Sequence, residues 1–466
     1  MSESHISPDV KEVRASQIDY HLKDIDIPLY RERKIMLETY PSSQFSLDNT
    51  QKWIQWMIPS GTVFNLSRSR YSYYITQAAG AASHYTLFHL SEFTLGTDIQ
   101  FVDAAGNALC DLKTADNYTK IARKLETSLD EYLTFDEFDP LRKSEKLASA
   151  VLEPADGSAG SVNYLEPLYF DATAAATKLE KYISCPLNAY KNTIFAYDKD
   201  LYFGVPMYVR INVNALNRMM WDDTSDGETA PSAGVKEVTA NSATSGIKQC
   251  YLHLAVEQNP NIVKSIVDKY TNRGGLKINI PYTIAVSTST PTEGSNNISI
   301  QVTKQSGPKL LQVLHTVWDT SRTINTAYDC DNSSAGKIES YRTSLTGNYL
   351  QDYTLSCAES ANGLLNNDDW LIANQKFCKN SVIQDRKMYK KHWFHLDRFY
   401  LENQDISSDD MNIGFELPNT IVNYVVETDT GADDLTHITY LTFRRTYVIS
   451  PNGIVYVNAL TNAATP

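Results

Sequence analysis

The sequence of 466 residues contains no long apolar run. No segment approaches the roughly 20 consecutive apolar residues that a membrane-spanning helix needs, and the mean hydropathy is −0.35. The first residues, MSESHISPDVKEVRAS, also lack the basic start and apolar stretch of a secretory signal peptide. These absences argue against a membrane or secreted protein and predict a chain made and kept in the cytoplasm or nucleus.

Paired cysteines are also missing. The six cysteines are scattered, and none forms the Cys-x-x-Cys pair that zinc and redox motifs use. We therefore expect free, half-buried thiols in a reducing compartment. They are Cys110, Cys185, Cys250, Cys330, Cys357 and Cys378. In such a compartment the four Asn-x-Ser/Thr sequons are expected to be chance matches; they begin at Asn65, Asn117, Asn297 and Asn332.

Positive charge is scarce. The chain has 42 Lys and Arg against 55 Asp and Glu, for a net charge of −13. A protein that coats nucleic acid needs clustered cations, so we expect no direct, sequence-specific nucleic-acid binding. One basic cluster stands out, at Arg386, Lys387, Lys390 and Lys391. It is interpreted as a solvated face or a contact between subunits, with an acidic neighbour or nucleic acid as the alternative.

Catalytic and metal-binding motifs are absent or incomplete. His392 and His395 have a spacing that suits metal ligation on a helix, but their segment HWFHLD predicts a strand, where the two side chains face opposite sides. Gly336-Lys337 lacks the other residues of a phosphate loop. Four acidic pairs are interpreted as solvated loop tips, with a weak cation site as the alternative: Asp222-Asp223, Asp368-Asp369, Asp409-Asp410 and Asp433-Asp434. The sequence thus predicts no catalytic, cofactor-binding or metal-binding residue and no cofactor.

Tyrosine and alternating strands are what the sequence has in abundance. There are 29 Tyr, a residue that buries its ring and leaves its hydroxyl at a wet edge. In MYVRINVN (207–214), apolar residues alternate with Tyr208, Arg210 and Asn212, the pattern of a strand with one buried and one wetter face. WIQWMI (53–58) carries large groups on both faces and predicts a strand enclosed in a core. The predicted core residues are Trp53, Trp56, Met207, Val209, Ile211, Phe443 and Tyr447.

Strand patterns recur in two blocks. Helices are expected at 116–133, with Asp116 as the N-cap, and from Pro260 to just before Gly274-Gly275. Tight turns are expected at Gly106-Asn107 and at Ser450-Pro451-Asn452-Gly453. The predicted organisation is an N-terminal arm (1–42), a first β-domain (43–222), a polar connection (223–246) and a second β-domain (247–466).

The order and character of four segments resemble the double jelly-roll major capsid proteins of eukaryotic double-stranded DNA viruses, including virophages, polinton-like viruses, adintoviruses and the nucleocytoplasmic large DNA viruses. The segments are 49–75 (NTQKWIQWMIPSGTVFNLSRSRYSYYI), 185–221, 369–399, and a C-terminal stretch from NIGFELPNTIVNYVVE to THITYLTFRRTYVISPNGIVYV. The resemblance covers most of residues 45–460 and consists of segment order, with no invariant motif.

This resemblance implies an all-β fold of two consecutive eight-stranded antiparallel jelly-roll sandwiches, with a few inserted helices and long loops. It implies a structural protein of the virion without catalytic residues. Three chains would form a homotrimeric, pseudo-hexameric capsomer that tiles an icosahedral shell and meets penton and minor capsid proteins. The arm, over residues 8–40, would contact a minor protein, a neighbouring trimer or an internal membrane.

Three alternatives stay open. A minor capsid or scaffold protein could share the same fold. A two-domain β-sandwich of lectin or cell-attachment type would bind glycans or Ca²⁺ through exposed aromatic residues and acidic loops. A glycoside hydrolase on a β-sandwich would need two carboxylates facing each other across a cleft, and the sequence offers no such pair.

Overall fold

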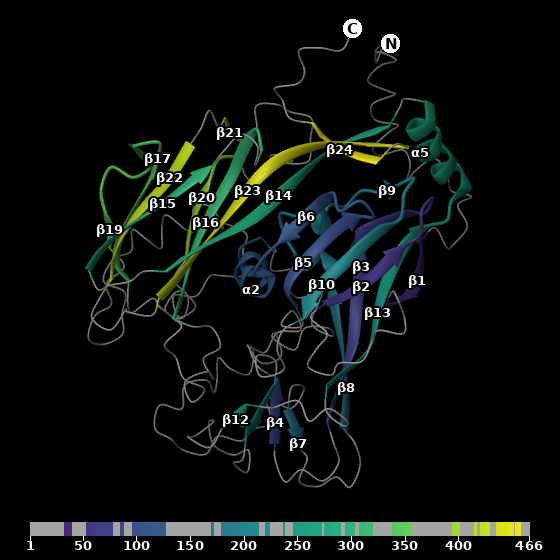
Figure 1. Cartoon of the computed structure of the whole chain (residues 1–466), viewed down its shortest axis with the longest axis horizontal. Helices are drawn as coiled ribbons and strands as arrows, with labels where there is room; N and C mark the ends of the chain where they lie inside the picture. Colours follow the sequence, from purple (N-terminus) through teal and green to yellow (C-terminus); the bar gives the residue numbers. More distant parts are fainter. Residues whose placement is uncertain are drawn as a thin grey trace, which may run out of the picture.

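The structure, a computed structural model, describes the strand-forming parts of the chain (Figure 1). The described residues are 32–39, 53–77, 84–87, 96–126, 169–171, 179–213, 220–223, 236–237, 246–272, 275–289, 294–302, 307–319, 338–356, 394–400, 414–416, 420–428, 435–451 and 453–457. Antiparallel β-strands dominate these residues, as the sequence predicts. No helix within them is long and apolar enough to cross a membrane.

The first sandwich packs two sheets face to face. One sheet has the order β1 (Glu32–Glu38), β13 (Gly246–Glu257), β3 (Val63–Gln77) and β8 (Leu179–Pro186), with β9 (Leu201–Tyr202) paired to β3. The other has the order β2 (Trp53–Ile58), β10 (Met207–Val213), β5 (Gly96–Asp103) and β6 (Ala108–Leu112). Trp56 of β2 joins the sheets: its ring centroid lies 6.0 Å from that of Tyr71 in β3, and its Nε1–H donates to the Cys250 carbonyl at 3.4 Å.

The second sandwich has the same construction. One sheet has the order β14 (Leu276–Ser289), β23 (Leu435–Ser450), β16 (Lys309–Asp319) and β20 (Phe394–Arg398), with β21 (Phe415–Glu416) on β16 and β24 (Gly453–Val457) on β23. The other has the order β15 (Gly294–Val302), β22 (Thr420–Thr428), β17 (Ile338–Leu345) and β18 (Asn348–Tyr349), with β19 (Leu355–Ser356) on β17. Apolar side chains of both sheets, such as Val422 and Phe443, form one buried cluster between them.

The strands of each sandwich pair in a nested order. In the second sandwich the pairs are β14 with β23, β15 with β22, β16 with β20, and β17 with β19. In the first they are β2 with β10, β3 with β8, and β5 with β6; between these pairs in the nest comes β4 (His84–Leu87) with β7 (Tyr169–Asp171), which lies in a separate sheet outside the sandwich. In each nested set, the paired strands form a long antiparallel ribbon that folds over into two packed sheets, which is the jelly-roll arrangement. The all-β, double jelly-roll fold is therefore confirmed by the chain's own pairing.

A small separate sheet stands apart from both sandwiches, at the bottom of Figure 1. Its order is β12 (Lys236–Glu237), β11 (Met220–Asp223), β4 and β7. It gathers strands from the long connections of the first sandwich. Asp222 and Asp223, interpreted from sequence as a solvated loop tip, lie instead on β11 and pair with β4 and β12. The loop part of that interpretation was wrong, because the strand partners of these residues are distant in sequence.

The two sandwiches share a core. Helix α2 (Ala115–Glu126) lies between them in Figure 1, and its Tyr118 ring packs 4.8 Å, between centroids, from the Tyr440 ring of β23. The Tyr440 hydroxyl donates to the Thr114 carbonyl at 3.1 Å, and the Thr283 hydroxyl of β14 donates to the Asn192 carbonyl at 2.8 Å. Buried apolar residues of both units form one continuous cluster. The sandwiches are thus packed directly against each other.

The two expected helices are present, and β5 and β6 form a hairpin over the expected turn at Gly106-Asn107. At the second expected turn, β23 pairs with β24 as far as Ser450 and Gly453, and Asn452 lies outside the described residues. Helix α5 (Pro260–Asn272) starts at the expected proline, and the side chain of Asn259 caps it by accepting from the Asn261 N–H at 3.0 Å. Gly275 follows with φ +136°, and a Cβ there would lie 2.6 Å from the Ile449 carbonyl, so the close approach to β23 requires glycine. Helix α2 ends at Glu126 among the described residues and begins at Ala115, one residue before the predicted N-cap, Asp116.

The pairing places one segment differently from the sequence-based division. β13 was expected in the second domain, which was set at 247–466, but it hydrogen-bonds to β1 and β3 of the first sandwich. β1, inside the expected arm (1–42), is likewise an edge strand of that sheet. We therefore propose 32–272 as the first unit and 275–457 as the second, with 1–31 as the arm. A deletion that tests the arm must stop before β1.

Candidate functional site

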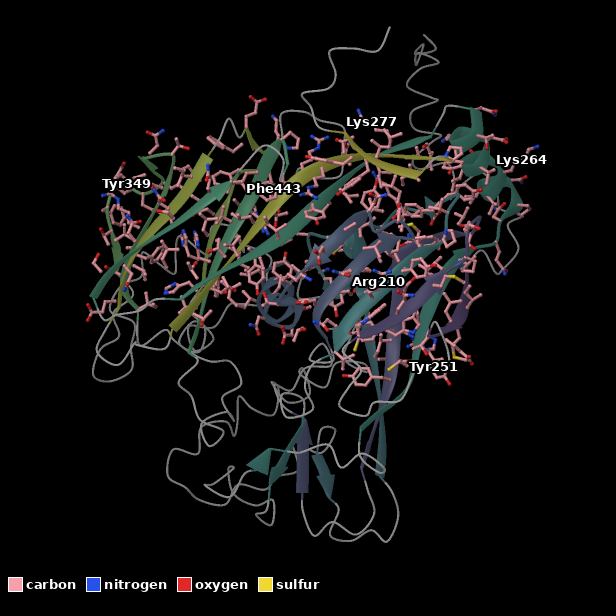
Figure 2. All side chains as sticks on the ribbon, in the orientation of Figure 1. Arg210, Tyr251, Lys264, Lys277, Tyr349 and Phe443 are labelled. Atoms are coloured by element: carbon pink, nitrogen blue, oxygen red, sulfur yellow. The ribbon has the colours of Figure 1, made fainter. Side chains whose placement is uncertain are left out.

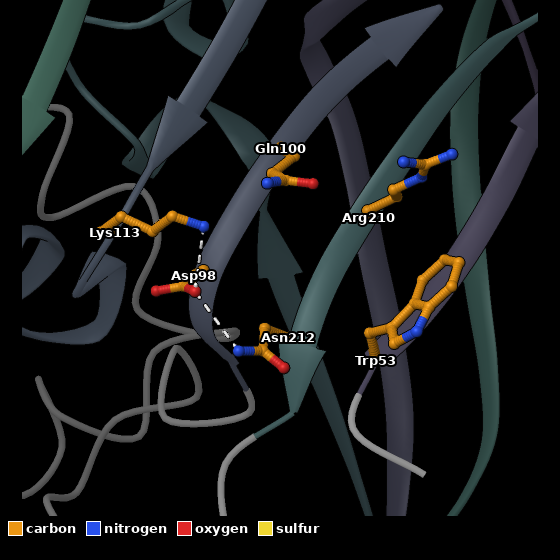
Figure 3. Close-up of a pocket in the computed structure, with 6 residues that line it drawn as sticks. All are labelled: Trp53, Asp98, Gln100, Lys113, Arg210 and Asn212. Carbon is orange, nitrogen blue, oxygen red and sulfur yellow. Dashed lines mark hydrogen bonds and ion pairs between the residues drawn. The ribbon is translucent and has the colours of Figure 1, made fainter. Parts of the chain in front are cut away.

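The outer face of the sheet β2-β10-β5-β6 carries a group of partly exposed polar and aromatic side chains. Alternation along β10 turns Met207, Val209 and Ile211 into the core, leaving Tyr208, Arg210 and Asn212 on the other side. A hollow of about 240 Å³ lies on this outer face (Figure 3). Its lining residues are Trp53, Asp98, Gln100, Lys113, Arg210 and Asn212.

At one end of the hollow, Arg210 is held by aromatic rings. Its guanidinium carbon lies 5.3 Å from the centre of the Trp53 ring and 5.6 Å from that of Tyr208. Its Nε–H donates to Gln55 Oε1 at 2.7 Å. Within the described part of the chain, no hydrogen bond or ion pair of its two terminal nitrogens is found. Cation–π contacts of this kind contribute about 0.5–1 kcal/mol each when exposed. With the hydrogen bond to Gln55, they hold the guanidinium group in one direction.

At the other end, Asp98 is fully engaged. It accepts from Lys113 Nζ and from Asn212 Nδ2, both at 3.3 Å, and from the Thr114 backbone N–H at 3.1 Å. Lys113 also pairs with Asp111 at 3.2 Å. Partial burial by itself lowers the pKa of Lys113, but the Asp111 and Asp98 carboxylates outweigh it and raise that pKa. Lys113 is therefore positive at neutral pH, and its charge is compensated inside the site.

This arrangement can bind a partner. The carboxylates of Asp98 and Asp111 both pair with Lys113, so these three charges are committed to one another inside the site. The hollow presents two groups to a partner: the indole of Trp53, which is 48% exposed, and the terminal NH₂ groups of the Arg210 guanidinium. An aromatic or apolar group with a carboxylate beside it matches this pair.

A second exposed surface lies on the second sandwich, at the turn between β17 and β19. Tyr349, Leu350 and Tyr353 are 54%, 39% and 55% exposed, and Asp352 between them is also exposed. We call residues 346–354 the Tyr-rich hairpin. Arg342 supports it from β17: its guanidinium stacks 3.5 Å from the centre of the Tyr349 ring, and its Nε–H and Nη2–H donate to the carbonyls of Gln351 and Asp352, both at 3.1 Å.

Three histidines lie buried between the sheets of the second sandwich. His315, His395 and His437 are each at most 1% exposed. His395 hydrogen-bonds to Asp397 at 3.0 Å and to the hydroxyl of Tyr341, and its ring stacks parallel to that of His315. Burial lowers the pKa of His315 to about 3 and that of His437 to about 4. The rings of His315 and His437 are therefore neutral at pH 7, and all three histidines are structural parts of the core.

The metal motif considered at His392 and His395 does not assemble within the described residues. His395 is buried against Tyr341 and Asp397, and His392 lies outside the described ranges. No group of three or more His, Cys, Asp or Glu residues in the described part of the chain could hold a metal ion. His395 contributes to packing, as the strand interpretation predicts.

The predicted core residues fall into two classes. Six are at most 4% exposed: Trp56, Met207, Val209, Ile211, Phe443 and Tyr447. Trp53 differs, because β2 buries only the face of Ile54, Trp56 and Ile58 and turns Trp53 toward the hollow. The expectation that both faces of β2 lie inside a core was wrong for this side chain. Aromatic character alone does not tell which of two tryptophans on opposite faces is enclosed.

Most other sequence candidates lie outside the described residues. They are Gly336-Lys337, the acidic pairs at 368–369, 409–410 and 433–434, the basic cluster at 386–391, and Cys330, Cys357 and Cys378. Cys110, Cys185 and Cys250 are described; they are buried, and none of them forms a disulfide within the described residues. Burial raises the pKa of the Cys110 and Cys250 thiols, which keeps both protonated.

Sequence reasoning missed the hollow and the Tyr-rich hairpin as sites. The signal for half of the hollow was present, because the alternation in 207–213 assigned Tyr208, Arg210 and Asn212 to the wetter face. Asp98 and Lys113 could not be added from sequence, because strand register brings them beside Asn212. The exposed run TGNYLQDYT (346–354) was visible, but nothing marked it as supported by Arg342.

Comparisons with known proteins give matches in structure only. A scan against protein-family models found no match, and a search of curated proteins found no significant one. Among solved structures, the chain is similar to the Faustovirus major capsid protein, at 10% identity and a TM-score of 0.49, covering 95% of this chain and 97% of that one. The mavirus major capsid protein gives 12% identity and a TM-score of 0.45, covering 95% of each chain. A chain of the Sputnik virophage gives 11% identity and 0.47, covering 94% of this chain and 91% of that one.

Proposed function

We propose that the chain is a structural major capsid protein whose homotrimers form pseudo-hexameric capsomers of an icosahedral viral shell. Two kinds of observation support this. The sequence segments at 49–75, 185–221, 369–399 and the C-terminal strands resemble that family in order and character. The described fold has the matching architecture, with two nested jelly-roll sandwiches in one chain.

The single observation that carries the proposal is the fixed union of the two sandwiches. Tyr440 reaches from β23 into the first unit, contacting both Tyr118 and Thr114. Tyr447 of the same strand donates its hydroxyl hydrogen to the Ala108 carbonyl of β6 at 3.2 Å. A rigid pair of sandwiches is a building block with two similar halves, so three copies present six sandwiches around one axis. A flexible linker would not fix that geometry.

The partners follow from this role. We propose self-association first into trimers and then into a shell, with penton and minor capsid proteins at its special positions and the virion as the final location. The arm, now residues 1–31, would contact a minor protein, a neighbouring trimer or an inner membrane. Assembly by this chain relies on the burial of tyrosine-rich sides and on weaker polar contacts between capsomers.

The test is the native mass of the purified protein, combined with negative-stain images of the same fraction. We expect three times the 52.4 kDa of the chain and particles with a hexagonal outline. A monomer or dimer with no such outline at micromolar concentration would overturn the proposal.

A second candidate function is glycan binding by a two-domain attachment protein, which one observation favours. The hollow places the half-exposed Trp53 indole beside the amides of Gln100 and Asn212 and the carboxylate of Asp98. An aromatic platform flanked by such polar groups suits the apolar face and hydroxyls of a sugar. Binding to a glycan array that Trp53→Ala abolishes would support this candidate, and a monomeric native mass would accompany it.

A further inference from the structure

We propose that the Tyr-rich hairpin of one copy docks into the hollow on the first sandwich of the next copy, with Asp352 paired to Arg210. This inference rests on the proposed self-association and names the two surfaces that make it. The contact joins unlike surfaces, so it runs head to tail around a ring of three chains.

The Tyr-rich hairpin is preformed for such a contact. The Leu350 N–H donates to the Thr343 carbonyl at 3.0 Å, and Gln351 Oε1 accepts from the Thr343 N–H at 2.9 Å. With Arg342 stacked under Tyr349, the turn is fixed before any partner arrives. Pre-organisation lowers the entropy lost on binding. Three large side chains that are exposed to solvent on one fixed turn indicate an interaction surface.

The hollow is complementary to the hairpin in charge and in aromatic character. It offers an indole face and a guanidinium whose Nε is already committed to Gln55, which leaves the terminal fork for a carboxylate. Asp352 supplies that carboxylate. It precedes Tyr353, lies two residues after Leu350, and forms no ion pair within the described part of the chain. A bidentate Arg–carboxylate pair inside an aromatic rim gives direction as well as affinity.

The positions of the two surfaces favour a second copy as the occupant. Figure 2 labels Tyr349 at the far end of the second sandwich and Arg210 on the first sandwich, well separated in the same molecule. A chain that carries both halves of a complementary contact at separate places joins to its own copies head to tail. Such a contact closes into a ring when the rotation between copies is right. With two sandwiches per chain, closure at three places six sandwiches in the ring.

A charge-swap experiment tests the pairing. Arg210→Glu and Asp352→Arg each place like charges in the contact, so each variant should raise the concentration of half-assembly into trimers at least tenfold. The double variant restores an opposite pair and should return assembly to within about threefold of wild type. Lys264→Glu, an exposed charge reversal on α5, is the matched control and should leave assembly unchanged. Analytical ultracentrifugation measures all four, with circular dichroism to verify the fold.

Mixing the two single variants gives a second readout. An Arg210→Glu chain and an Asp352→Arg chain form an opposite-charge pair whichever of the two supplies the hairpin. In a ring with an odd number of chains, however, the two kinds cannot alternate, so two chains of the same kind must be neighbours. Equal mixtures should therefore recover only part of the trimer, because one contact in every ring stays mismatched. Complete recovery would point to an even-numbered assembly and would overturn the ring of three.

Crosslinking covers the case in which charge reversal disturbs folding. In a Trp53→Cys, Tyr353→Cys double variant, mild oxidation should give covalent dimers and trimers, whereas each single cysteine variant should give monomers. A wild-type protein that is not trimeric would overturn the proposed function itself. A trimeric wild type with no crosslink, or with no effect of either charge reversal, would overturn only this contact. Glycan binding at Trp53 by a monomeric protein would count against both.

Discussion

The two sandwiches share a topology but fill their cores differently. The first places aromatic rings against one another, with Phe101 contacting Phe64, Phe195 and Phe203 at centroid distances of 5.8–6.4 Å. The second buries His315, His395 and Asp397 among its apolar side chains. An aromatic core depends little on pH, whereas a core with neutral histidines depends on it strongly. The two sandwiches therefore share a topology but should differ in how strongly their stability depends on pH, and this difference can be tested directly.

Acid should produce the largest effect, and it should fall on the second sandwich. His315 and His437 have pKa values of about 3 and about 4 in the folded protein, below the ordinary 6.5, because burial disfavours the charged ring. The unfolded chain thus binds more protons between about pH 6.5 and pH 4, so stability is complete above pH 6.5 and declines as the pH falls. The loss at pH 4.5 is on the order of 2–3 kcal/mol for each histidine.

Regional hydrogen exchange measures this effect. At pH 4.5, corrected for intrinsic exchange rates, amides of β16 and β20 should lose protection before those of β2 and β10. Asp397 does not cancel the effect: burial alone raises its pKa, but adjacent His395 outweighs burial and lowers it. Its contribution is therefore lost only at still lower pH. Equal loss of protection in both sandwiches would contradict the assignment of acid sensitivity to the second core.

Truncating the first core gives the next largest effect. Trp56→Ala removes a fully buried indole that bridges two sheets, and we expect a loss of about 3–5 kcal/mol in the free energy of unfolding. Trp53→Ala, only three residues away on the same strand, removes a half-exposed ring and should cost under about 1 kcal/mol. Urea denaturation of both variants at pH 7.5 makes the comparison. Similar losses for the two would mean that the outer face of β2 is enclosed after all.

The connection between the sandwiches gives the smallest effect among the buried positions. Tyr440→Phe keeps the ring against Tyr118 but deletes the hydroxyl that contacts Thr114, leaving the Thr114 carbonyl without that donor. We expect a loss of about 1–2 kcal/mol and, more tellingly, a calorimetric transition that broadens or splits as the two halves unfold separately. A single transition that merely shifts to lower temperature would show that apolar packing alone couples them.

Local patterns in the sequence predicted local structure well. The alternation in 207–213 identified both faces of β10, and Pro260 with the glycines after residue 272 marked helix α5. These succeed because strand periodicity and helix capping depend on neighbouring residues. Trp53 and Trp56 mark the limit: alternation separated them onto two faces, but which face is buried depends on the sheet that packs above.

Features that depend on distant partners could not be predicted. β13 looked like the start of the second domain, yet its hydrogen-bonding partners are β1 and β3. The histidine cluster joins β16, β20 and β23, which lie far apart in sequence. The resemblance to capsid proteins supplied the overall topology, which no periodicity reveals. It did not supply the docking surfaces, because these are set by individual side chains such as Arg210 and Arg342.

The nested pairing also fixes an order of events during synthesis. β14 pairs with β23, and β23 is also the neighbour of β16, so the central strand of that sheet is the last long strand to leave the ribosome. Strand pairing over such separations is slow and leaves edges open until it is complete. A chain that stops before residue 435 therefore lacks the strand that holds both β14 and β16, as well as Tyr440 and Tyr447. Unfinished chains therefore have no closed second sandwich to support the Tyr-rich hairpin.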